Sequence, residues 1–304
     1  MFAQGKYKYC FGKLNIRCQF NFVVFGGGLC AMPLYANVVS MSLYKKTSGN
    51  PKLENSFFLF LDVLGFSAEI IYNHKTGDSQ SNLTKFNQAF NMASPHLTKG
   101  PKTWDYKIFT DNIALATPIN KFGDDENDFG FIIVSLIEYQ LEMVLADFFI
   151  RGAWSVGQFY MDNLIVYGYP LIEAYRLESQ KAINPRIIFS EDMKSTIKRY
   201  LSYYAKGFSA PLRAHLLKDI DGELFVNYLF AIYRDNENPD YSALLKHKNV
   251  IEARLNKHKA NPKVFPKYVW SAEYHNFFCQ KFITKCPVQY FIHGLGSSRN
   301  FSFI

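Results

Sequence analysis

The chain has 304 residues, of which 48% are hydrophobic and 20% are charged, and it carries a formal net charge of +8 at pH 7. This globular composition supplies one large or two modest domains with a substantial core, so it excludes a disordered or fibrous protein. The positive charge favours an anionic partner such as a nucleotide, a nucleic acid or a membrane surface. A scattered surface excess of Lys and Arg gives the same total.

Nucleic acid is the anionic partner that the charge pattern supports least. The basic residues are scattered, with a mild concentration only in 244–267, LLKHKNVIEARLNKHKANPKVFPK, which predicts a solvated helix and a proline-containing loop. A nucleic-acid groove needs dense clusters of Lys and Arg interleaved with aromatic residues, and the sequence has none. We therefore expect no nucleic-acid partner.

The first 54 residues differ from the rest of the chain. Residues 20–39, FNFVVFGGGLCAMPLYANVV, are mostly apolar and follow a basic stretch, which is typical of a signal-like or membrane-anchoring segment. The glycines and Pro33 make this segment a poor spanning helix. A conventional polar sequence starts at Met41, so we interpret 1–54 as an N-terminal extension that the functional protein does not need. A membrane anchor is the alternative.

The five cysteines lie at positions 10, 18, 30, 279 and 286. None falls between 31 and 278, so the middle of the chain has neither a disulfide framework nor a zinc-ligand cluster. A reducing cytoplasm is the simplest setting for this distribution.

Apolar runs and helical periodicities alternate from residue 55 onward. In chain order we expect a strand at 57–62, helices at 67–73 and 82–93, a hairpin at 106–118, a polar linker at 120–130, a helix at 131–148, a strand at 150–161, a strand leading through Gly168 into a helix at 164–179, a short strand at 185–190 and a helical, basic tail after 235. This order predicts an α+β fold, an α/β sandwich with helices on one face of a sheet. We assign 55–235 to one domain of catalytic size and 236–304 to a helical, basic C-terminal region.

Two acidic residues stand where a sheet can bring oxygen ligands together. Asp62 ends the apolar strand of FFLFLDVLGFS, and Asp111 lies in the turn of the hairpin YKIFTDNIALA. A carboxylate at the end of a buried strand is costly unless positive charge meets it. Mg²⁺ and Mn²⁺ bind few carboxylates and complete their shells with water and phosphate oxygens. The alternatives are that Asp62 caps the following helix and that Asp111 is an ordinary turn residue.

The turn after Asp62 has a sequence suited to binding phosphate. Leu64, Gly65, Phe66 and Ser67 lead directly into the next predicted helix. Backbone N–H groups at such a turn and at a helix N-terminus point outward and favour anions. We therefore expect these four residues to contact the phosphates of a nucleotide.

Four motifs occur in the order FLDVLGFS, KIFTDNIALA, IRGAWSVGQ and YGYPLIEAYRLES, and together they resemble the class III nucleotide cyclases. That family shows a strand ending in Asp before Gly-Phe-Thr, a Lys-x-x-Gly-Asp hairpin, an Arg-x-Gly-x-x-x-Gly strand and a Gly-x-x-x-Asn-x-Ala-x-Arg-x-Glu helix. Asp62 and Asp111 fall on the family's metal-binding aspartates, and Arg176 falls on the arginine of the helix motif. The resemblance covers residues 55–230 and implies a ferredoxin-type sheet with helices packed on it.

Two positions depart from the purine cyclases of that family. Ile172 stands where they carry the Asn of the helix motif, and Ile165 stands where they carry the acid that reads adenine. The segments LDVLGFS, LIEAY and DIDGELFVNYL are similar instead to segments of the pyrimidine cyclases of the bacterial Pycsar antiphage system. This similarity implies UTP or CTP as the substrate, UTP before CTP, and a cyclic nucleotide messenger that activates a separate effector protein. A purine cyclase and a non-catalytic cyclase-like module are the alternatives.

The resemblance also implies how the site is assembled. Two divalent ions, Mn²⁺ or Mg²⁺, would be held by Asp62 and Asp111, and Arg176 would stabilise charge on the α-phosphate. The acids would come from one subunit of a head-to-tail homodimer and Arg176 from the other. A salt bridge from Arg176 to Glu173 or Glu178 is the alternative role for this arginine.

The residues that read the base are the least determined part of the site. Lys107 keeps the hairpin position of the second adenine-reading residue, so it would face the base or a phosphate; a solvated strand lysine is the alternative. Arg151 either helps to bind phosphate or pairs on its own strand. Aromatic side chains are candidates for narrowing the base pocket to a single ring, among them Phe109, Phe159, Tyr160 and Tyr167.

Overall fold

The computed structural model describes residues 43–44, 50–98, 104–119, 125–204, 210–233, 238–296 and 299–304. Ser42–Ile304 forms one compact unit. The predicted apolar segment at 20–39 and the first three cysteines lie outside the described residues, whereas Cys279 and Cys286 are described and both are free thiols. Within the described part of the chain, no helix has the length and apolarity to cross a bilayer.

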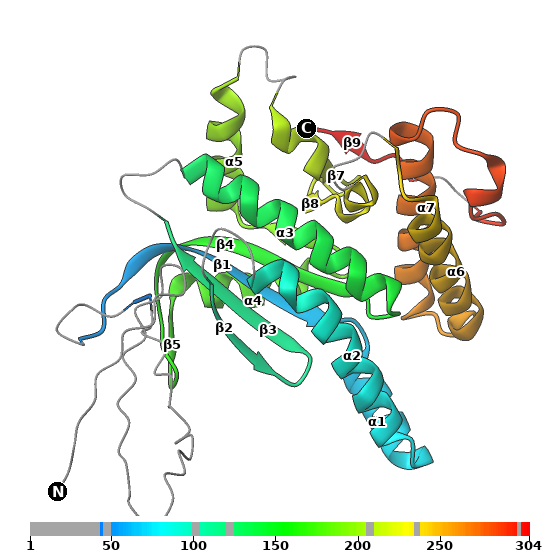
Figure 1. Ribbon diagram of the computed structural model, residues 1–304, viewed down its shortest axis with the longest axis horizontal. Coiled ribbons are helices and arrows are strands. Elements are labelled where there is room, and N and C mark those ends of the chain that lie inside the picture. The colour runs from blue at the N-terminus through cyan, green and yellow to red at the C-terminus, as the bar shows by residue number, and fades with distance from the viewer. Residues whose placement is uncertain are drawn as a thin grey trace, which may run out of the picture. The chain divides into compact units, whose positions relative to one another are not determined.

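Strands and helices alternate along the chain, as Figure 1 shows. Their bounds are β1 (Glu54–Val63), α1 (Phe66–Thr76), α2 (Ser79–Thr98), β2 (Asp105–Phe109), β3 (Asn112–Pro118), α3 (Asp125–Leu145), β4 (Ile150–Met161), β5 (Val166–Gly168), α4 (Tyr169–Gln180), β6 (Ile187–Phe189), α5 (Glu191–Ser202), the 3₁₀ helix η1 (Pro211–His215), β7 (Leu216–Lys218), β8 (Leu224–Val226), η2 (Tyr228–Ile232), α6 (Tyr241–His258), α7 (Phe265–Phe282), η3 (Val288–Tyr290) and β9 (Ser302–Phe303).

The strands form one mixed sheet in the order β2-β3-β1-β4-β6-β8-β7-β9, with β5 paired to β4. Its first part follows the β-α-β-β-α-β pattern of the ferredoxin-like motif, because β1 lies between β3 and β4 and all three pairings there are antiparallel. Strand β6 then joins β4 in parallel after the crossover through α4. The predicted α+β fold with a ferredoxin-type sheet is confirmed.

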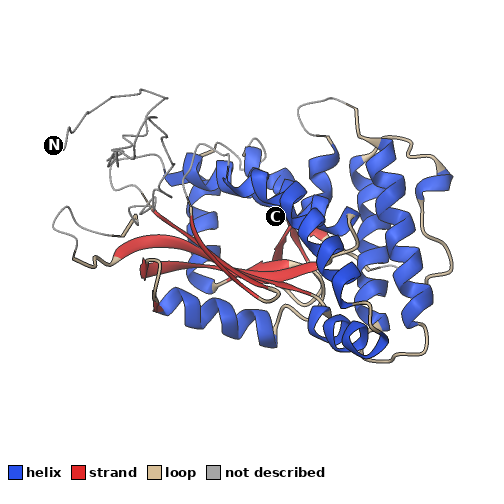
Figure 2. Cartoon of the chain, turned by 60° about the horizontal axis from the view of Figure 1, so that its bottom comes forward, coloured by secondary structure: helices blue, strands red, loops and turns tan. Residues whose placement is uncertain are grey.

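Helices cover both faces of the sheet, so the prediction that they lie on one face was wrong (Figure 2). Successive side chains of a strand point to opposite faces. On β1, Phe57 contacts Phe129 of α3 with ring centroids 6.3 Å apart, whereas Phe60 contacts Tyr175 of α4 at 5.7 Å. Because β1 is covered on both sides, its sequence is a continuous apolar run instead of an alternating one.

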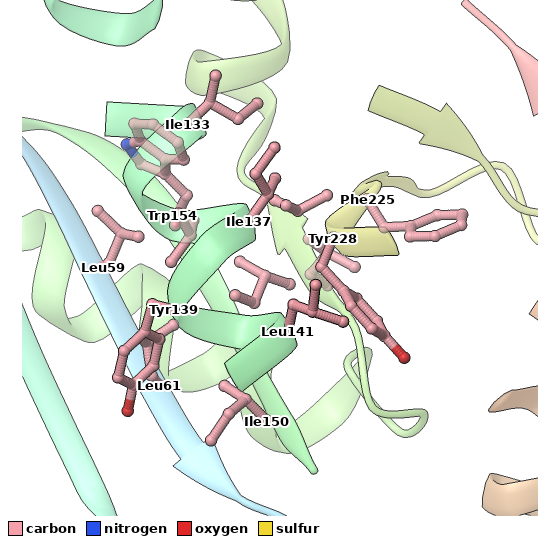
Figure 3. Packing of buried hydrophobic residues seen from close by; sticks show 14 of the residues in the cluster. Leu59, Leu61, Ile133, Ile137, Tyr139, Leu141, Ile150, Trp154, Phe225 and Tyr228 are labelled. Carbon is pink, nitrogen blue, oxygen red and sulfur yellow. The ribbon is translucent and has the colours of Figure 1, made fainter. Parts of the chain in front are cut away.

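The main core lies between β1, β4 and α3 (Figure 3). Apolar residues recur along α3 at spacings of three and four, and they pack against Leu59, Leu61 and Trp154 of the sheet. This helix begins at Asp125, six residues before the predicted start at 131. The acidic residues of the predicted linker form its first turn, where negative charge is favoured by the helix dipole.

Both ends of the described chain belong to the folded unit. Tyr44 is fully buried, and its ring contacts Phe159 edge-on at 5.7 Å between centroids. The folded unit therefore includes part of the predicted extension 1–54. At the other end, β9 pairs with β7, so the C-terminal region contributes a strand to the same sheet. Its two long helices, α6 and α7, lie side by side.

Candidate functional site

Asp62 and Asp111 come together because β1 and β3 are neighbouring strands. Asp62 is paired in register with Asn112, the residue that follows Asp111, and the Val63 N–H donates to the Asp111 carbonyl at 3.2 Å. The two residues are only 8% and 7% exposed. The structure thus places two acids, from distant parts of the sequence, on one almost buried spot at the end of the sheet.

Three polar side chains surround the Asp111 carboxylate. The Thr110 hydroxyl and the Asn112 amide lie 2.7 and 3.2 Å from Oδ1, and the Ser67 hydroxyl donates to Oδ2 at 3.3 Å. Thr110 has a φ of 57°, a backbone conformation that β-branched residues rarely adopt. Such strained positions concentrate at functional sites, where the surrounding structure holds them. The hairpin turn therefore holds Asp111 in one defined orientation.

Arg151 connects Asp62 to a third carboxylate. It is the direct register partner of Asp62 on β4, and its Nε donates to Asp62 Oδ2 at 2.7 Å. Its second branch reaches Glu178 of α4, with 2.7 Å between Arg151 Nη2 and Glu178 Oε1. Glu178 is buried on the face of α4 that covers the sheet. One guanidinium thus pairs with the carboxylates of Asp62 and Glu178, whereas the Asp111 carboxylate contacts the neutral side chains described above.

The electrostatics of this cluster favour an additional cation. Burial raises the pKa of Asp62, Arg151 opposes this effect, and the nearby charge of Asp111 raises the pKa further. Burial likewise raises the pKa of Glu178, again opposed by Arg151 and reinforced by Asp62 and Asp111. Clustered carboxylates that raise each other's pKa are typical of metal-binding sites. A bound cation would lower these pKa values again, because it stabilises the ionised carboxylates.

The donor set of the site fits Mg²⁺ or Mn²⁺. Among the described residues, no group of three or more His, Cys, Asp or Glu side chains is arranged to hold a metal ion. A site built on the Asp62 and Asp111 carboxylates alone suits these ions, which keep several waters and bind substrate phosphates. Such a site is completed by its substrate.

The predicted phosphate-binding turn is partly occupied by the protein itself. The Leu64 N–H donates to the Phe149 carbonyl at 2.8 Å, so this group is not available to a ligand. Gly65 precedes α1 with a left-handed φ of 78°, which suits glycine. Within the described chain, the N–H groups of Gly65, Phe66 and Ser67 have no backbone acceptor. The turn can therefore offer these three N–H groups at the N-terminus of α1.

Arg176 does not meet the acids within one chain. It lies on the outer face of α4, its side chain is 57% exposed, and it forms a two-pronged pair with Glu173, with Nη2 3.0 Å from Oε1. The opposite face of α4, which carries Ala174, Leu177 and Glu178, is buried against the sheet. Of the two predicted alternatives, the structure shows the pair with Glu173, whereas Glu178 pairs with Arg151.

The predicted base-reading residues lie around a neighbouring hairpin. The Lys107 ammonium donates to the Asn163 carbonyl in the loop between β4 and β5, and Ile165 of the same loop is more than half exposed. Of the four aromatic candidates, two are core residues and two are about half exposed or more; the buried pair is Phe159 and Tyr160, and the exposed pair is Phe109 and Tyr167.

Two charged residues of the cluster were missed or undervalued from sequence. Glu178 is the last residue of the helix motif and was given no role except as an alternative partner for Arg176, although its spacing from Ala174 places it on the buried face of α4. Lys267 of α7 lies close enough to Asp62 and Glu178 for their charges to act on its pKa, which burial and Arg151 lower. No local pattern marks this lysine, because it reaches the site from the C-terminal region.

The chain has structural likenesses among solved proteins. It is 18% identical to the adenylyl cyclase CyaB from P. aeruginosa, with a TM-score of 0.42, over 58% of this chain and 94% of that one. It is 14% identical to the guanylyl cyclase Cya2, with a TM-score of 0.40, over 58% of this chain and 91% of that one. No protein-family model and no curated protein matches the sequence.

Proposed function

We propose that the protein is a nucleotide cyclase, which converts a nucleoside triphosphate into its 3′,5′-cyclic monophosphate and pyrophosphate. The observation that carries this proposal is the side-by-side position of Asp62 and Asp111 at the strand ends, next to N–H groups at the N-terminus of α1 that have no backbone acceptor in the described chain. Carboxylates for metal ions and amides for phosphates are the two requirements of phosphoryl transfer, which depends on positioning and charge neutralisation. The ordered sequence motifs support the same activity.

The residues of the site would have separate roles in metal binding and phosphate binding. Asp62 and Asp111 would hold two divalent ions, Mn²⁺ or Mg²⁺, which lower the pKa of the ribose 3′-hydroxyl and neutralise phosphate charge. Ser67 would keep Asp111 oriented through its hydroxyl. The N–H groups of Gly65 and Phe66 would orient the phosphates for in-line attack. Arg151 would keep Asp62 ionised, as the opposite charge beside it favours.

A head-to-tail homodimer would supply the missing arginine. Arg176 points away from the acids of its own chain and lies among large apolar side chains. Tyr169, Ile172 and Tyr175 of the same helix are each more than half exposed. Exposed apolar surface of this kind marks interaction sites, and closed two-fold dimers are the commonest assembly. The partner's Arg176 would then face the α-phosphate bound at Asp62 and Asp111.

The substrate that we propose is a pyrimidine nucleotide, UTP before CTP. Ile165 offers no acceptor for an exocyclic amine, and the acid of the same loop, Asp162, is already engaged. Its Oδ1 accepts from the Leu164 and Ile165 N–H groups, and its Oδ2 accepts from the Tyr160 hydroxyl. A purine amine left without a partner costs about 1–3 kcal/mol, or roughly ten- to a hundredfold in kcat/KM.

The cellular role that we propose rests on the resemblance alone. The cyclic pyrimidine nucleotide would be a second messenger in antiphage defence and would activate a separate effector protein. Cells carrying the chain together with its effector should resist phage infection. Resistance that persists after Asp62→Ala would contradict this role.

Incubation of the purified protein with each of the four nucleoside triphosphates and Mn²⁺ tests the activity and the base together. We expect cyclic UMP or cyclic CMP with purines at least about tenfold behind in kcat/KM. Equal or better use of ATP or GTP would refute the proposed pyrimidine preference but would still support the proposed cyclase activity. The absence of any cyclic product, with or without added phage extract, would refute the cyclase itself.

A further inference from the structure

A cavity of about 460 Å³ opens beside the proposed phosphate-binding turn. One wall is formed by the turn itself, Leu64 and Gly65, and by α1. The opposite wall belongs to the C-terminal region and includes the end of α6 and the start of α7, helices that lie side by side (Figure 1). The cavity is therefore lined at one end by residues that follow Asp62 closely in the sequence. At the other end it is lined by the C-terminal region, which lies outside the predicted catalytic domain.

The walls of this cavity are rich in positive charge. Its basic residues are Lys85, Arg254, Lys257 and Lys267, against two acids, Glu69 and Asp147. Three of the four cations are engaged by these acids. Arg254 binds Asp147 and Glu69 at 2.5 Å each, Lys85 lies 3.1 Å from Asp147 Oδ2, and Lys257 lies 3.6 Å from Glu69 Oε1.

Lys267 differs from the other cations of the cavity. It lies in the first turn of α7, it is partly buried, and no described carboxylate lies within 4 Å of its ammonium group. No described oxygen accepts a hydrogen bond from that group either. A partly buried ammonium without a protein acceptor is available to an anionic ligand, which it would bind through charge-assisted hydrogen bonds.

We propose that this cavity receives the β- and γ-phosphates of the nucleotide and that Lys267 is the residue that binds them, an inference that rests on the proposed cyclase activity. The cavity begins at Gly65, whose N–H has no backbone acceptor in the described chain. The phosphate chain would run from the acid pair over this turn to Lys267. The C-terminal region would then form part of the active site, and pyrophosphate would leave through the cavity.

A purely structural role for Lys267 makes a different prediction. The acids Asp62, Asp111 and Glu178 outnumber the nearby Arg151, and Lys267 could serve only to balance their charge. In that case its removal would change stability and leave phosphate affinity unaltered. Binding of a phosphate chain that contains no nucleoside separates the two roles.

The experiment titrates inorganic tripolyphosphate into the full-length protein by calorimetry in the presence of Mg²⁺, without turnover. The test variant is Lys267→Met, which keeps the apolar stem of the side chain, and the matched control is Lys257→Met on the same cavity. We expect Lys267→Met to weaken tripolyphosphate binding at least about tenfold, since a charge-assisted hydrogen bond is lost. Lys257→Met should change it less than about twofold, and Lys267→Arg should restore most of the affinity.

A second measurement on the unaltered protein covers the case in which Lys267→Met does not fold. Tripolyphosphate should slow chemical acetylation of Lys267 and leave that of Lys257 unchanged. Unchanged binding in Lys267→Met, an equal loss in both variants, or unprotected Lys267 would overturn the proposal. Tripolyphosphate binding that depends on Lys267 in a protein without cyclase activity would refute the proposed function and keep this site.

Discussion

Arg151 and Asp62 face each other directly across β4 and β1, and Arg151 Nε lies 2.7 Å from Asp62 Oδ2. The same guanidinium reaches Glu178 on the helix that covers this face of the sheet. A planar group with several donors is suited to binding two carboxylates at once, which lysine cannot do with the same geometry. This arginine therefore holds together a strand end, a helix and the proposed metal site.

Replacement of Arg151 should destabilise the protein and increase its response to metal. Arg151→Met removes the guanidinium that pairs with the buried carboxylates of Asp62 and Glu178, so we expect a loss of about 3 kcal/mol in the free energy of unfolding. Mn²⁺ should raise the melting temperature of this variant more than that of the wild type, because the ion would meet the unpaired charge. Urea denaturation and thermal melts with and without Mn²⁺ measure both effects. An equal shift of the melting temperature with Mn²⁺ in the two proteins would show that the ion does not bind at Asp62.

Loss of either proposed metal ligand should abolish cyclic nucleotide formation. Asp62→Ala and Asp111→Ala each remove a charged ligand, and we expect less than about a tenth of wild-type turnover in Mn²⁺. Both variants should remain folded, since each removes one of several mutually repelling carboxylates. Glu252→Ala, a partly exposed residue of α6 that pairs with Lys248, is the control and should keep full activity. Either active-site variant retaining more turnover than this limit would contradict the metal assignment.

Composite active sites predict that two inactive variants restore each other. Asp62→Ala and Arg176→Ala should each be inactive alone. When they are mixed and allowed to exchange subunits, half of the dimers carry one intact site, so we expect roughly a quarter of wild-type activity. Each variant mixed with itself is the control. Activity of Arg176→Ala alone, or no recovery in the mixture, would show that the arginine does not act across a subunit boundary.

The N-terminal boundary can be tested by truncation. A chain that starts at Met41 keeps Tyr44, which is buried against Phe159, and should be as active and stable as the full chain. A chain that starts at Asn50 loses this side chain, and we expect a destabilisation of about 3 kcal/mol, as for other large core residues. Tyr44→Ala in the full chain should reproduce that loss in a urea melt. If the Met41 chain loses activity, the preceding residues contribute to function.

Stability should fall in mild acid because of a partly buried histidine. Burial lowers the pKa of His215 from 6.5 to about 4. Below pH 6.5, His215 is protonated in the unfolded chain but stays neutral in the folded chain. The free energy of unfolding therefore decreases as the pH drops from 6.5 towards about 4. The slope is at most about 1.4 kcal/mol per pH unit for one group.

His215→Phe, which keeps the contact with Phe230, should flatten this part of the profile. His74→Phe on the exposed side of α1 is the control and should leave the slope unchanged. The measurement is a series of urea melts between pH 7 and pH 4. An identical pH dependence in wild type and His215→Phe would contradict the assignment.

The sequence by itself was sufficient for several of the elements and for singling out the central acid pair. The strand at 150–161 and the hairpin at 106–118 were predicted to within a residue, because alternating and continuous apolar runs directly encode how a strand is buried. Asp62 and Asp111 could be singled out because each interrupts or follows such a run. Their proximity was then a consequence of two neighbouring antiparallel strands.

Only the tertiary structure decided which charges meet at the site. Arg151 and Glu178 face Asp62 through the register of β4 and the packing of α4, and Arg176 faces away although it lies two residues from Glu178. Lys267 reaches the cluster from a helix far along the chain. Local periodicity records how deeply a residue is buried, whereas the identity of its neighbours depends on contacts between distant segments. For that reason the acids could be predicted from the sequence, but their partners could not.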